Sequence, residues 1–314
     1  MGDGDGAVGR PGGELAFIER LKRRLPASPE GQCWIGDDAA VLDAGSLLKT
    51  DVLVEGVHFD LAWCSPQDVG WKAVAVNLSD IAAMGGSPSA AVVSLVVRDD
   101  EPGVPDRVMD GIAVAADRFG CPIVGGDTSI GPALVVAVAV LGRAHPSGPV
   151  LRSGARPGDI VFVTGDLGGA GSALARRLAG EREQPGMERL RRPVPRLAVG
   201  AAVAAAGGSA MIDISDGLAT DLGHLCSASG CGAVVDQDAL PLAPGVDIET
   251  ALFSGDDYEL LFTAPAGSAA TFERWRLQPA TAIGSMTESG PHITLAGRHG
   301  ERSLLRRAWE HPIP

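Results

Sequence analysis

Short apolar runs rich in valine alternate with longer stretches of helical periodicity between residues 34 and 143. Such alternation is typical of a mixed α and β fold, and it differs from the pattern of an all-β or an all-α chain. The most apolar run, residues 133–141, is followed by Gly142 and Arg143 and is too short to cross a membrane, so it predicts a buried strand.

One helix in this first half carries polar residues of interest. Ser65 can cap it, Pro66 suits its first position, and the glycine pair at residues 85–86 ends it. Asn77 and Asp80 are three residues apart and therefore share a face of this helix. The pattern predicts a carboxylate near the C-terminal end of the helix.

The second half follows a connector rich in proline and glycine, residues 144–158. Beyond it the pattern predicts strands at 160–164 and 210–213, and helices at 172–179, 196–206 and 216–228. With 314 residues, two cores are expected rather than one. We therefore predict an α+β protein with an N-terminal domain at 14–148, a C-terminal domain at 149–314 and a disordered glycine-rich tail at 1–13.

Composition excludes several classes of protein. The formal net charge of −13 argues against a nucleic-acid partner, because such proteins carry clustered basic surface. No apolar run is long enough for a membrane span. The five cysteines are scattered and include no C-x-x-C pair, which argues against a disulfide framework and a zinc site. We expect a protein of the reducing cytoplasm.

Aspartates recur where apolar strands end. Each one alone is typical of a turn or a helix cap. Together they would repel one another unless cations neutralised them, and Mg²⁺ is the hard ion that bridges carboxylates to phosphates. The pattern predicts a magnesium site of the kind that bridges carboxylates to phosphates, and its candidate residues are Asp37, Asp38, Asp51, Asp80, Asp127, Asp213 and Asp216.

Three other features each leave two readings open. The glycine-rich segment 165–171 could present backbone N–H groups to an anion or could simply pack a helix against a strand. Arg152 could clamp a phosphate or form an ion pair. His58 stands alone, which favours a structural role over a zinc site. No serine lies in the G-x-S-x-G setting of a hydrolase nucleophile, so acyl transfer is not expected.

The motifs together resemble the thiamine-monophosphate kinase family. The resemblance rests on segments that follow in order from about residue 14 to the C-terminus: GDDAAVL at 36–42, KTD at 49–51, VHF at 57–59, AVNLSDIAAMG at 75–85, GGDT at 125–128, IDISDGL at 212–218 and GDDYEL at 255–260.

The resemblance implies the fold of the aminoimidazole-ribotide-synthetase-like superfamily. That fold has an N-terminal α/β domain whose strands pair with a partner chain, and a C-terminal α+β domain, so a homodimer is expected. The implied reaction is ATP-dependent phosphorylation of thiamine monophosphate to thiamine diphosphate, the last step of thiamine diphosphate biosynthesis. A direct in-line transfer assisted by Mg²⁺ needs no protein nucleophile or general base.

The resemblance also implies roles for single residues. The positions that match magnesium ligands are Asp38, Thr50, Asp51, Asp80, Asp127, Asp213 and Asp216. Those that match ATP contacts are Gly126, Asp127, Arg152 and Ser215, and those that match thiamine monophosphate contacts are His58, Asp256 and Trp309. A requirement for K⁺ and the number of metal ions stay open.

Two positions depart from the family pattern. Serine is common in the family where this chain has Lys49, and glutamate where it has Asp256. The rivals are other enzymes of the superfamily and a module that binds Mg·ATP without turnover. Selenophosphate synthetase is disfavoured because no cysteine precedes Cys33, and a hydrogenase-maturation relative because the sequence given does not end in cysteine. Aminoimidazole-ribotide synthetase is the hardest to exclude.

Overall fold

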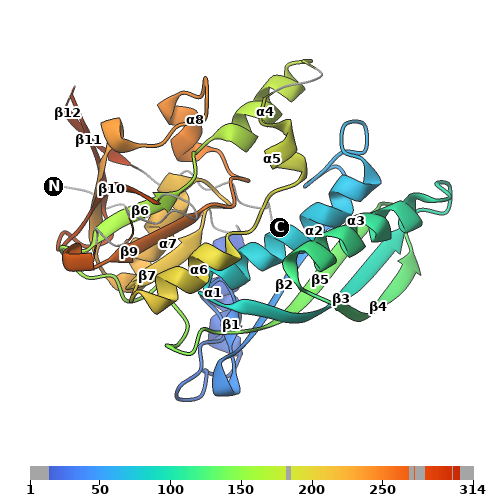
Figure 1. Cartoon of the computed structure of the whole chain (residues 1–314), viewed down its shortest axis with the longest axis horizontal. Coiled ribbons are helices and arrows are strands. Elements are labelled where there is room, and N and C mark those ends of the chain that lie inside the picture. Colours follow the sequence, from blue (N-terminus) through green and yellow to red (C-terminus); the bar gives the residue numbers. More distant parts are fainter. Residues whose placement is uncertain (1–13, 182–184, 269–271, 273–279, 299, 305–314) are drawn as a thin grey trace.

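Two β-sheets, each covered by helices, make up the structure (Figure 1). A computed structural model describes residues 14–181, 185–268, 272, 280–298 and 300–304. The first sheet has the order β1-β2-β5-β3-β4. Its strands are β1 (Ala40–Val41), β2 (Ser46–Val54), β3 (Ser87–Val97), β4 (Ile123–Ile130) and β5 (Val135–Arg143).

Helices α2 (Pro66–Ala83) and α3 (Val104–Phe119) cover one face of this sheet. Ser65 and Asp68 form a reciprocal capping box at the start of α2, which fixes where the helix begins. The two helices pack closely because each has a glycine at the contact. A Cβ at Gly70 would lie 2.0 Å from the carbonyl oxygen of Val108, and a Cβ at Gly111 would lie 2.0 Å from that of Gln67.

The second sheet has the order β12-β11-β8-β10-β6-β9-β7 and is antiparallel except between β8 and β11. Its strands are β6 (Ile160–Thr164), β7 (Ala210–Asp213), β8 (Gly232–Asp236), β9 (Leu260–Ala264), β10 (Ala280–Thr287), β11 (Ile293–Gly297) and β12 (Gly300–Leu304). The helices of this half are α4 (Gly169–Leu178), α5 (Met187–Arg191), α6 (Leu197–Ala205), α7 (Leu218–Ser229) and α8 (Ile248–Phe253).

Helix α2 connects the two halves. It contacts β2 and β5 of the first sheet and also α6 and β7 of the second half. Ala82 and Ala83, at its C-terminal end, belong to a buried apolar cluster with Phe162, Val203 and Phe262. The polar residues on the last turns of α2 therefore lie where the two sheets meet.

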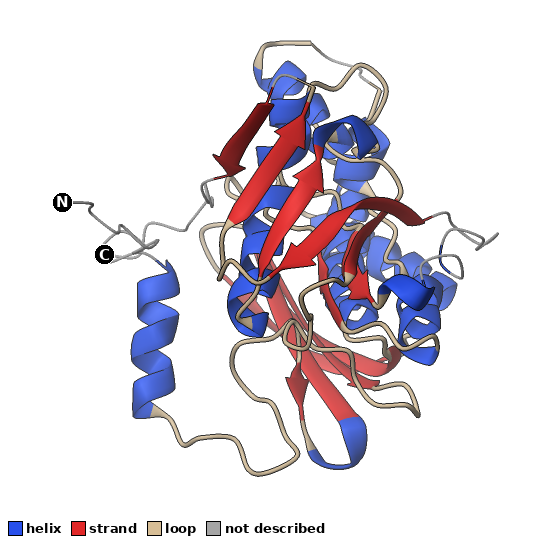
Figure 2. Ribbon diagram, turned by 90° about the vertical axis from the view of Figure 1, so that its left-hand side faces the viewer, coloured by secondary structure: helices blue, strands red, loops and turns tan. Residues whose placement is uncertain are grey.

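Helix α1 (Glu14–Arg24) stands to one side of both sheets and is joined to β1 by a long loop (Figure 2). Three single-turn 3₁₀ helices complete the described elements: η1 (Asp43–Gly45), η2 (Gln237–Ala239) and η3 (Ala266–Ser268). No helix in the described ranges has the length and apolar character that crossing a bilayer requires.

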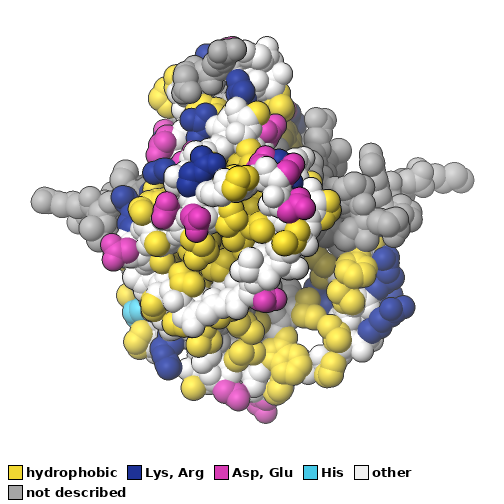
Figure 3. Space-filling view, turned by 90° about the vertical axis from the view of Figure 1, so that its right-hand side faces the viewer, with side chains coloured by type: hydrophobic (Ala, Val, Ile, Leu, Met, Phe, Trp, Pro, Cys, Tyr) yellow, Lys and Arg dark blue, Asp and Glu magenta, His cyan; other side chains and the backbone are white. Residues whose placement is uncertain are grey.

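The face of the first sheet opposite α2 is apolar, and no described helix covers it. Leu48 and Val52 on β2, Leu141 on β5 and Val92 on β3 are each more than two-fifths exposed. Further exposed valine and isoleucine side chains lie on the edge strand β4. Figure 3 views the molecule from the side on which β4 lies in Figure 1, and hydrophobic side chains occupy much of that surface.

The predicted α+β fold is confirmed, and several element positions agree closely with the sequence pattern. The strands at 160–164 and 210–213 are found at those residues, and the capped helix begins at Pro66. Two helix starts differ from the prediction. Helix α4 begins at Gly169 rather than 172, because Gly168 turns the chain at a φ of 79°. Helix α7 begins at Leu218 rather than 216, because Gly217 is non-helical.

The predicted domain boundary at residue 149 lies in the loop between β5 and β6 and stays a prediction. The predicted tail at 1–13 lies outside the described residues.

Candidate active site

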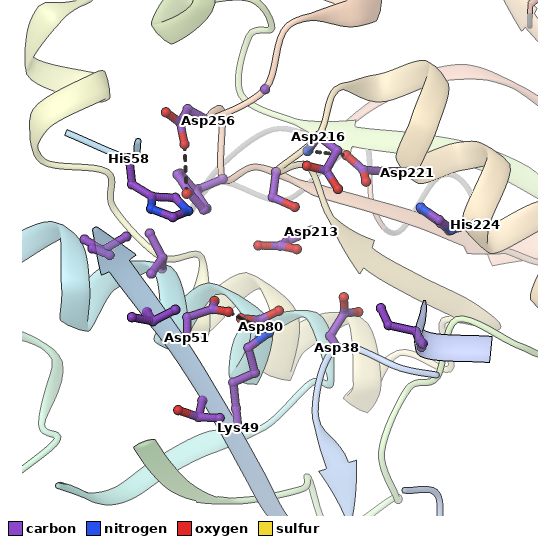
Figure 4. A pocket seen from close by; sticks show the side chains of 18 of the residues that line it. Asp38, Lys49, Asp51, His58, Asp80, Asp213, Asp216, Asp221, His224 and Asp256 are labelled. Carbon is purple, nitrogen blue, oxygen red and sulfur yellow. Dashed lines mark hydrogen bonds and ion pairs between the residues drawn. The ribbon is translucent and has the colours of Figure 1, made fainter. Parts of the chain in front are cut away.

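A large open cleft of about 1900 Å³ runs between the two sheets and α1. It is lined from both halves of the chain, and Figure 4 shows the acidic side chains that point into it. The predicted site residues that line it are Asp37, Asp38, Thr50, Asp51, His58, Asp80, Arg152, Asp213, Ser215, Asp216 and Asp256. Residues more than 200 positions apart in sequence thus meet in one place.

Three of the predicted metal ligands form a tight cluster. Asp38 comes from the loop before β1, Asp80 from the last turn of α2 and Asp213 from the end of β7. One carboxylate oxygen from each lies within 4.8 Å of the others, and all three residues are buried. Burial raises the pKa of Asp80 and of Asp213 well above the ordinary value, and the neighbouring carboxylates add to the effect.

Cationic and hydroxyl groups offset part of this negative charge. The Arg152 guanidinium donates to Asp38 Oδ1, with its Nε at 3.2 Å. The Ser79 hydroxyl donates to Asp213 Oδ2 at 2.5 Å. Lys49 Nζ lies 3.1 Å from Asp80 Oδ2. Of the two roles that the sequence left open for Arg152, the structure shows the ion pair.

The cluster fits a hard divalent cation. Asp38 is 2% exposed, and its Oδ2 is buried without a hydrogen-bond partner among the described residues. A buried oxygen without a partner costs free energy unless a cation satisfies it. Carboxylate oxygens are the ligands that Mg²⁺ prefers. The residues best placed to hold such an ion are Asp38, Asp80 and Asp213.

A second acidic group adjoins the cluster at the start of α7. The Asp216 N–H donates to Asp221 Oδ2 at 3.1 Å, and Asp221 is 2% exposed. Burial raises the pKa of Asp221, and Asp216 and Asp213 raise it further. Sequence reasoning missed Asp221. Its only signal was its position in the first turn of the helix that follows the predicted ligand Asp216.

The opposite wall of the cleft is built around Asp256. Lys72 Nζ donates to Asp256 Oδ2 and the Tyr258 hydroxyl to Asp256 Oδ1, both at 2.9 Å. Asp256 and Tyr258 adopt positive φ values of 67° and 50°, which are unfavourable for residues other than glycine. His58 faces the same space, and its Nδ1 accepts the Val54 N–H at 3.0 Å. Tyr258 belongs to the GDDYEL motif at 255–260 but was assigned no role from the sequence, and Lys72 lies in no quoted motif.

Four other predicted residues lie away from the carboxylate cluster, or outside the described residues. Gly126 and Asp127 are on the edge strand β4 and are not among the residues that line the cleft. Gly126 also has a packing reason to be glycine, because a Cβ there would lie 2.0 Å from the Val93 carbonyl oxygen. The Thr50 hydroxyl donates to the Val138 carbonyl at 3.0 Å, and alternation along β2 places its side chain opposite those of Lys49 and Asp51. Trp309 lies outside the described residues.

The glycine-rich segment before α4 already holds an anion from within the chain. The Gly168 N–H donates to Asp257 Oδ2 at 2.7 Å. This backbone group is therefore occupied by a carboxylate, and the segment packs closely, since a Cβ at Gly171 would lie 2.1 Å from Ser254 Cβ. The packing reading of this segment is the one that the structure favours.

Family models match most of the chain. The N-terminal domain of AIR synthase related protein matches residues 36–144, and the C-terminal domain of the same family matches residues 156–295.

Curated relatives are similar to this chain over most of their length. Thiamine-monophosphate kinase of Salmonella typhimurium is 39% identical over 81% of this chain and 83% of its own. The enzyme of that name from Mycobacterium tuberculosis is 41% identical over 76% of this chain and 73% of its own. The one from Aquifex aeolicus is 35% identical over 95% and 98%.

Solved structures share the fold. The structure of AaThiL complexed with AMPPCP and TMP has a TM-score of 0.85 and 34% identity, and the match covers 98% of this chain and 99% of that one. Hydrogenase maturation protein HypE in complex with ATP has a TM-score of 0.71, and the match covers 88% of this chain and 90% of that one. At 20% identity, this similarity is one of fold alone.

Proposed function

This chain is a kinase of the thiamine-monophosphate kinase family, within the AIR synthase related proteins, and on that premise we propose that it phosphorylates thiamine monophosphate to thiamine diphosphate with ATP. The observation that carries the proposal is the cleft itself. It places a buried carboxylate cluster that suits Mg²⁺ opposite a wall formed by His58, Lys72 and Asp256. The reaction is the last step of thiamine diphosphate biosynthesis.

The proposed roles follow from charge and position. Asp38, Asp80 and Asp213 would hold the metal, which when bound neutralises phosphate charge and aligns the two phosphates for in-line transfer. Arg152 lies beside Asp38 and can reach a phosphate oxygen by exchanging part of its ion pair. These positions support binding of the nucleotide on this side of the cleft.

The acceptor is expected on the other side. Its phosphate oxygen is already an anion at neutral pH, so the transfer requires no strong general base and no phosphoenzyme. Asp256 offers a carboxylate to the cationic thiazolium ring, and Lys72 and Tyr258 fix the direction of that carboxylate. The AaThiL structure complexed with AMPPCP and TMP supports the choice of the two substrates by similarity.

A coupled assay of ADP release tests the proposal. Thiamine, thiamine monophosphate and aminoimidazole-ribotide precursors are offered side by side with Mg·ATP. We expect turnover only with thiamine monophosphate, and thiamine diphosphate as its product. Turnover on the aminoimidazole precursor would instead assign the chain to its nearest rival, and Mg·ATP binding without turnover on any of them would indicate a non-catalytic module. Asp110→Asn, an exposed site on α3, is the control variant.

We further propose that the chain acts as a homodimer through the uncovered face of the first sheet. That face exposes Leu48, Val52, Val92 and Leu141 together. An exposed apolar patch of this kind is typical of a protein–protein interface. Strand β1 pairs only with Leu47 and Leu48 of β2, so the rest of β2, next to the cleft, has a free edge.

A second copy can complete the site from this side. Strand β4 also has a free edge in the described structure, and it carries Gly126 and Asp127. If the β4 edge of a second copy lies along the free stretch of β2, it brings its own Gly126 and Asp127 toward the cleft. This arrangement accounts for the distance of both residues from the site of their own chain.

The free state of all five cysteines supports a reducing compartment, the cytoplasm.

A further inference from the structure

Lys49 is a charged residue of the cleft to which the proposed reaction assigns no role. Strand alternation places its side chain on the same face of β2 as Asp51, toward the carboxylate cluster. Its Nζ lies 3.1 Å from Asp80 Oδ2 and 3.5 Å from Asp51 Oδ1 (Figure 4). The side chain is 20% exposed, so this ammonium is largely removed from water.

The ammonium lies where two acidic groups need a cation. Asp38 is paired with Arg152, and Asp213 accepts a hydrogen bond from Ser79, whereas the ion pairs of Asp51 and Asp80 are both with Lys49. Both carboxylates lie within ion-pair distance of Lys49 Nζ, and a lysine amine is ordinarily protonated at neutral pH.

An ammonium and a divalent ion exclude each other at this point. A protonated lysine has three donors and no acceptor, so it cannot ligate a metal. A divalent ion that bridged Asp51 and Asp80 would lie in contact with the ammonium and be repelled by it. The carboxylates can hold one of the two cations, and the chain supplies its own.

We propose that Lys49 is a resident cation that takes the place of one divalent ion between Asp51 and Asp80. The chain then binds one divalent ion fewer than it would with serine at this position. The ion held by Asp38, Asp80 and Asp213 remains exchangeable, while the charge of Lys49 is permanent. This inference rests on the proposed function only in taking the cluster as a metal site, and it requires no turnover.

The test counts Mn²⁺ ions bound by the full chain, without nucleotide, by equilibrium dialysis and by the EPR signal of free Mn²⁺. Lys49→Ser and Lys49→Met should each bind one more ion than the wild type. Lys49→Arg, which keeps the charge, should bind the wild-type number. Lys22→Ser removes an exposed ammonium paired with Glu19, and it serves as the matched control with an unchanged count.

Two further measurements keep the test decisive if a variant is unstable. Without metal, Lys49→Met should unfold at a temperature lower by about 5 °C or more, since it leaves buried carboxylates unpaired, and Mn²⁺ should restore most of the loss. Adding Asp51→Asn to Lys49→Met should abolish the additional ion. Equal ion counts in the wild type, Lys49→Ser and Lys49→Met would overturn the proposal. Loss of kinase activity with the expected counts would bear on the proposed function alone.

Discussion

Asp257 offers the clearest quantitative test of the electrostatics around the cleft. It follows Asp256 in the strained segment that forms one wall, and its Oδ2 accepts the Gly168 N–H at 2.7 Å. The residue as a whole is partly exposed, but its Oδ1 is buried and has no hydrogen-bond partner among the described residues. Burial raises the pKa of Asp257 from 3.8 to about 7, against the opposing effect of the Gly168 hydrogen bond.

The sign of the pH effect follows from this raised pKa. The folded chain binds the Asp257 proton more tightly than the unfolded chain does. The contribution of this proton to the free energy of unfolding is therefore fully present below about pH 4 and is lost as the pH rises to about 7. Between pH 5 and pH 7 the loss covers two pH units, or roughly 2.7 kcal/mol at 1.36 kcal/mol per unit. Asp257→Asn does not titrate and should show no such loss from this position.

The experiment compares Asp257→Asn with the wild type in urea unfolding at pH 5 and pH 8.5. Relative to the wild type, the variant should gain roughly 2.7 kcal/mol of unfolding free energy between the two pH values. Other groups titrate alike in both proteins, so their contributions cancel in this difference. The gain should be the same with EDTA and with Mg²⁺, because Asp257 lies outside the carboxylate cluster. The control variant Asp110→Asn, at an exposed position on α3, should show no such pH-dependent gain in unfolding free energy. A difference that does not change with pH would refute the reasoning.

The remaining predictions concern the metal, the acceptor and the dimer. Asp80→Asn should abolish turnover and most of the Mg²⁺-dependent rise in melting temperature, and a variant that kept both would contradict the proposed metal site. Lys72→Met should raise the KM for thiamine monophosphate by about tenfold or more, equivalent to about 1.4 kcal/mol, and leave the KM for ATP unchanged. An equal rise in both constants would show that Lys72 acts on the fold and not on Asp256. Val52→Asp should convert a dimer of twice 32.0 kDa into a monomer by light scattering, and a dimeric variant would exclude this face as the interface.

The sequence was most informative where local signals decide structure. The start of α2 followed from Ser65 and Pro66, because a capping box is made by residues within one turn. Strands β6 and β7 were predictable because each is a short apolar run bounded by turn residues. The convergence of Asp38, Asp80 and Asp213 was also expected, since aspartates recur where apolar strands end and Asp80 was predicted near the end of a helix.

What the sequence could not predict depends on side chains that meet across long distances. Lys72 contacts Asp256, 184 residues away, and no local pattern encodes that pair. Asp221 resembled an ordinary first-turn acid of a helix until α7 was placed beside the cluster. Asp127 follows a glycine, as Asp37 does in the cleft, yet it lies on β4, the edge strand of the first sheet, and does not line the cleft. Strand order and helix placement, which are tertiary properties, decided these outcomes.

Helix α2 sets the spacing between the two halves of the reaction site. Lys72 faces the wall where the acceptor is expected, and Asp80 faces the metal cluster. They are eight residues apart on one buried helix, which corresponds to about 12 Å along its axis. Because α2 is rigid and packs on both sheets, this separation does not depend on how the loops of the cleft move. The positions of the acceptor wall and the metal cluster are therefore coupled through the core.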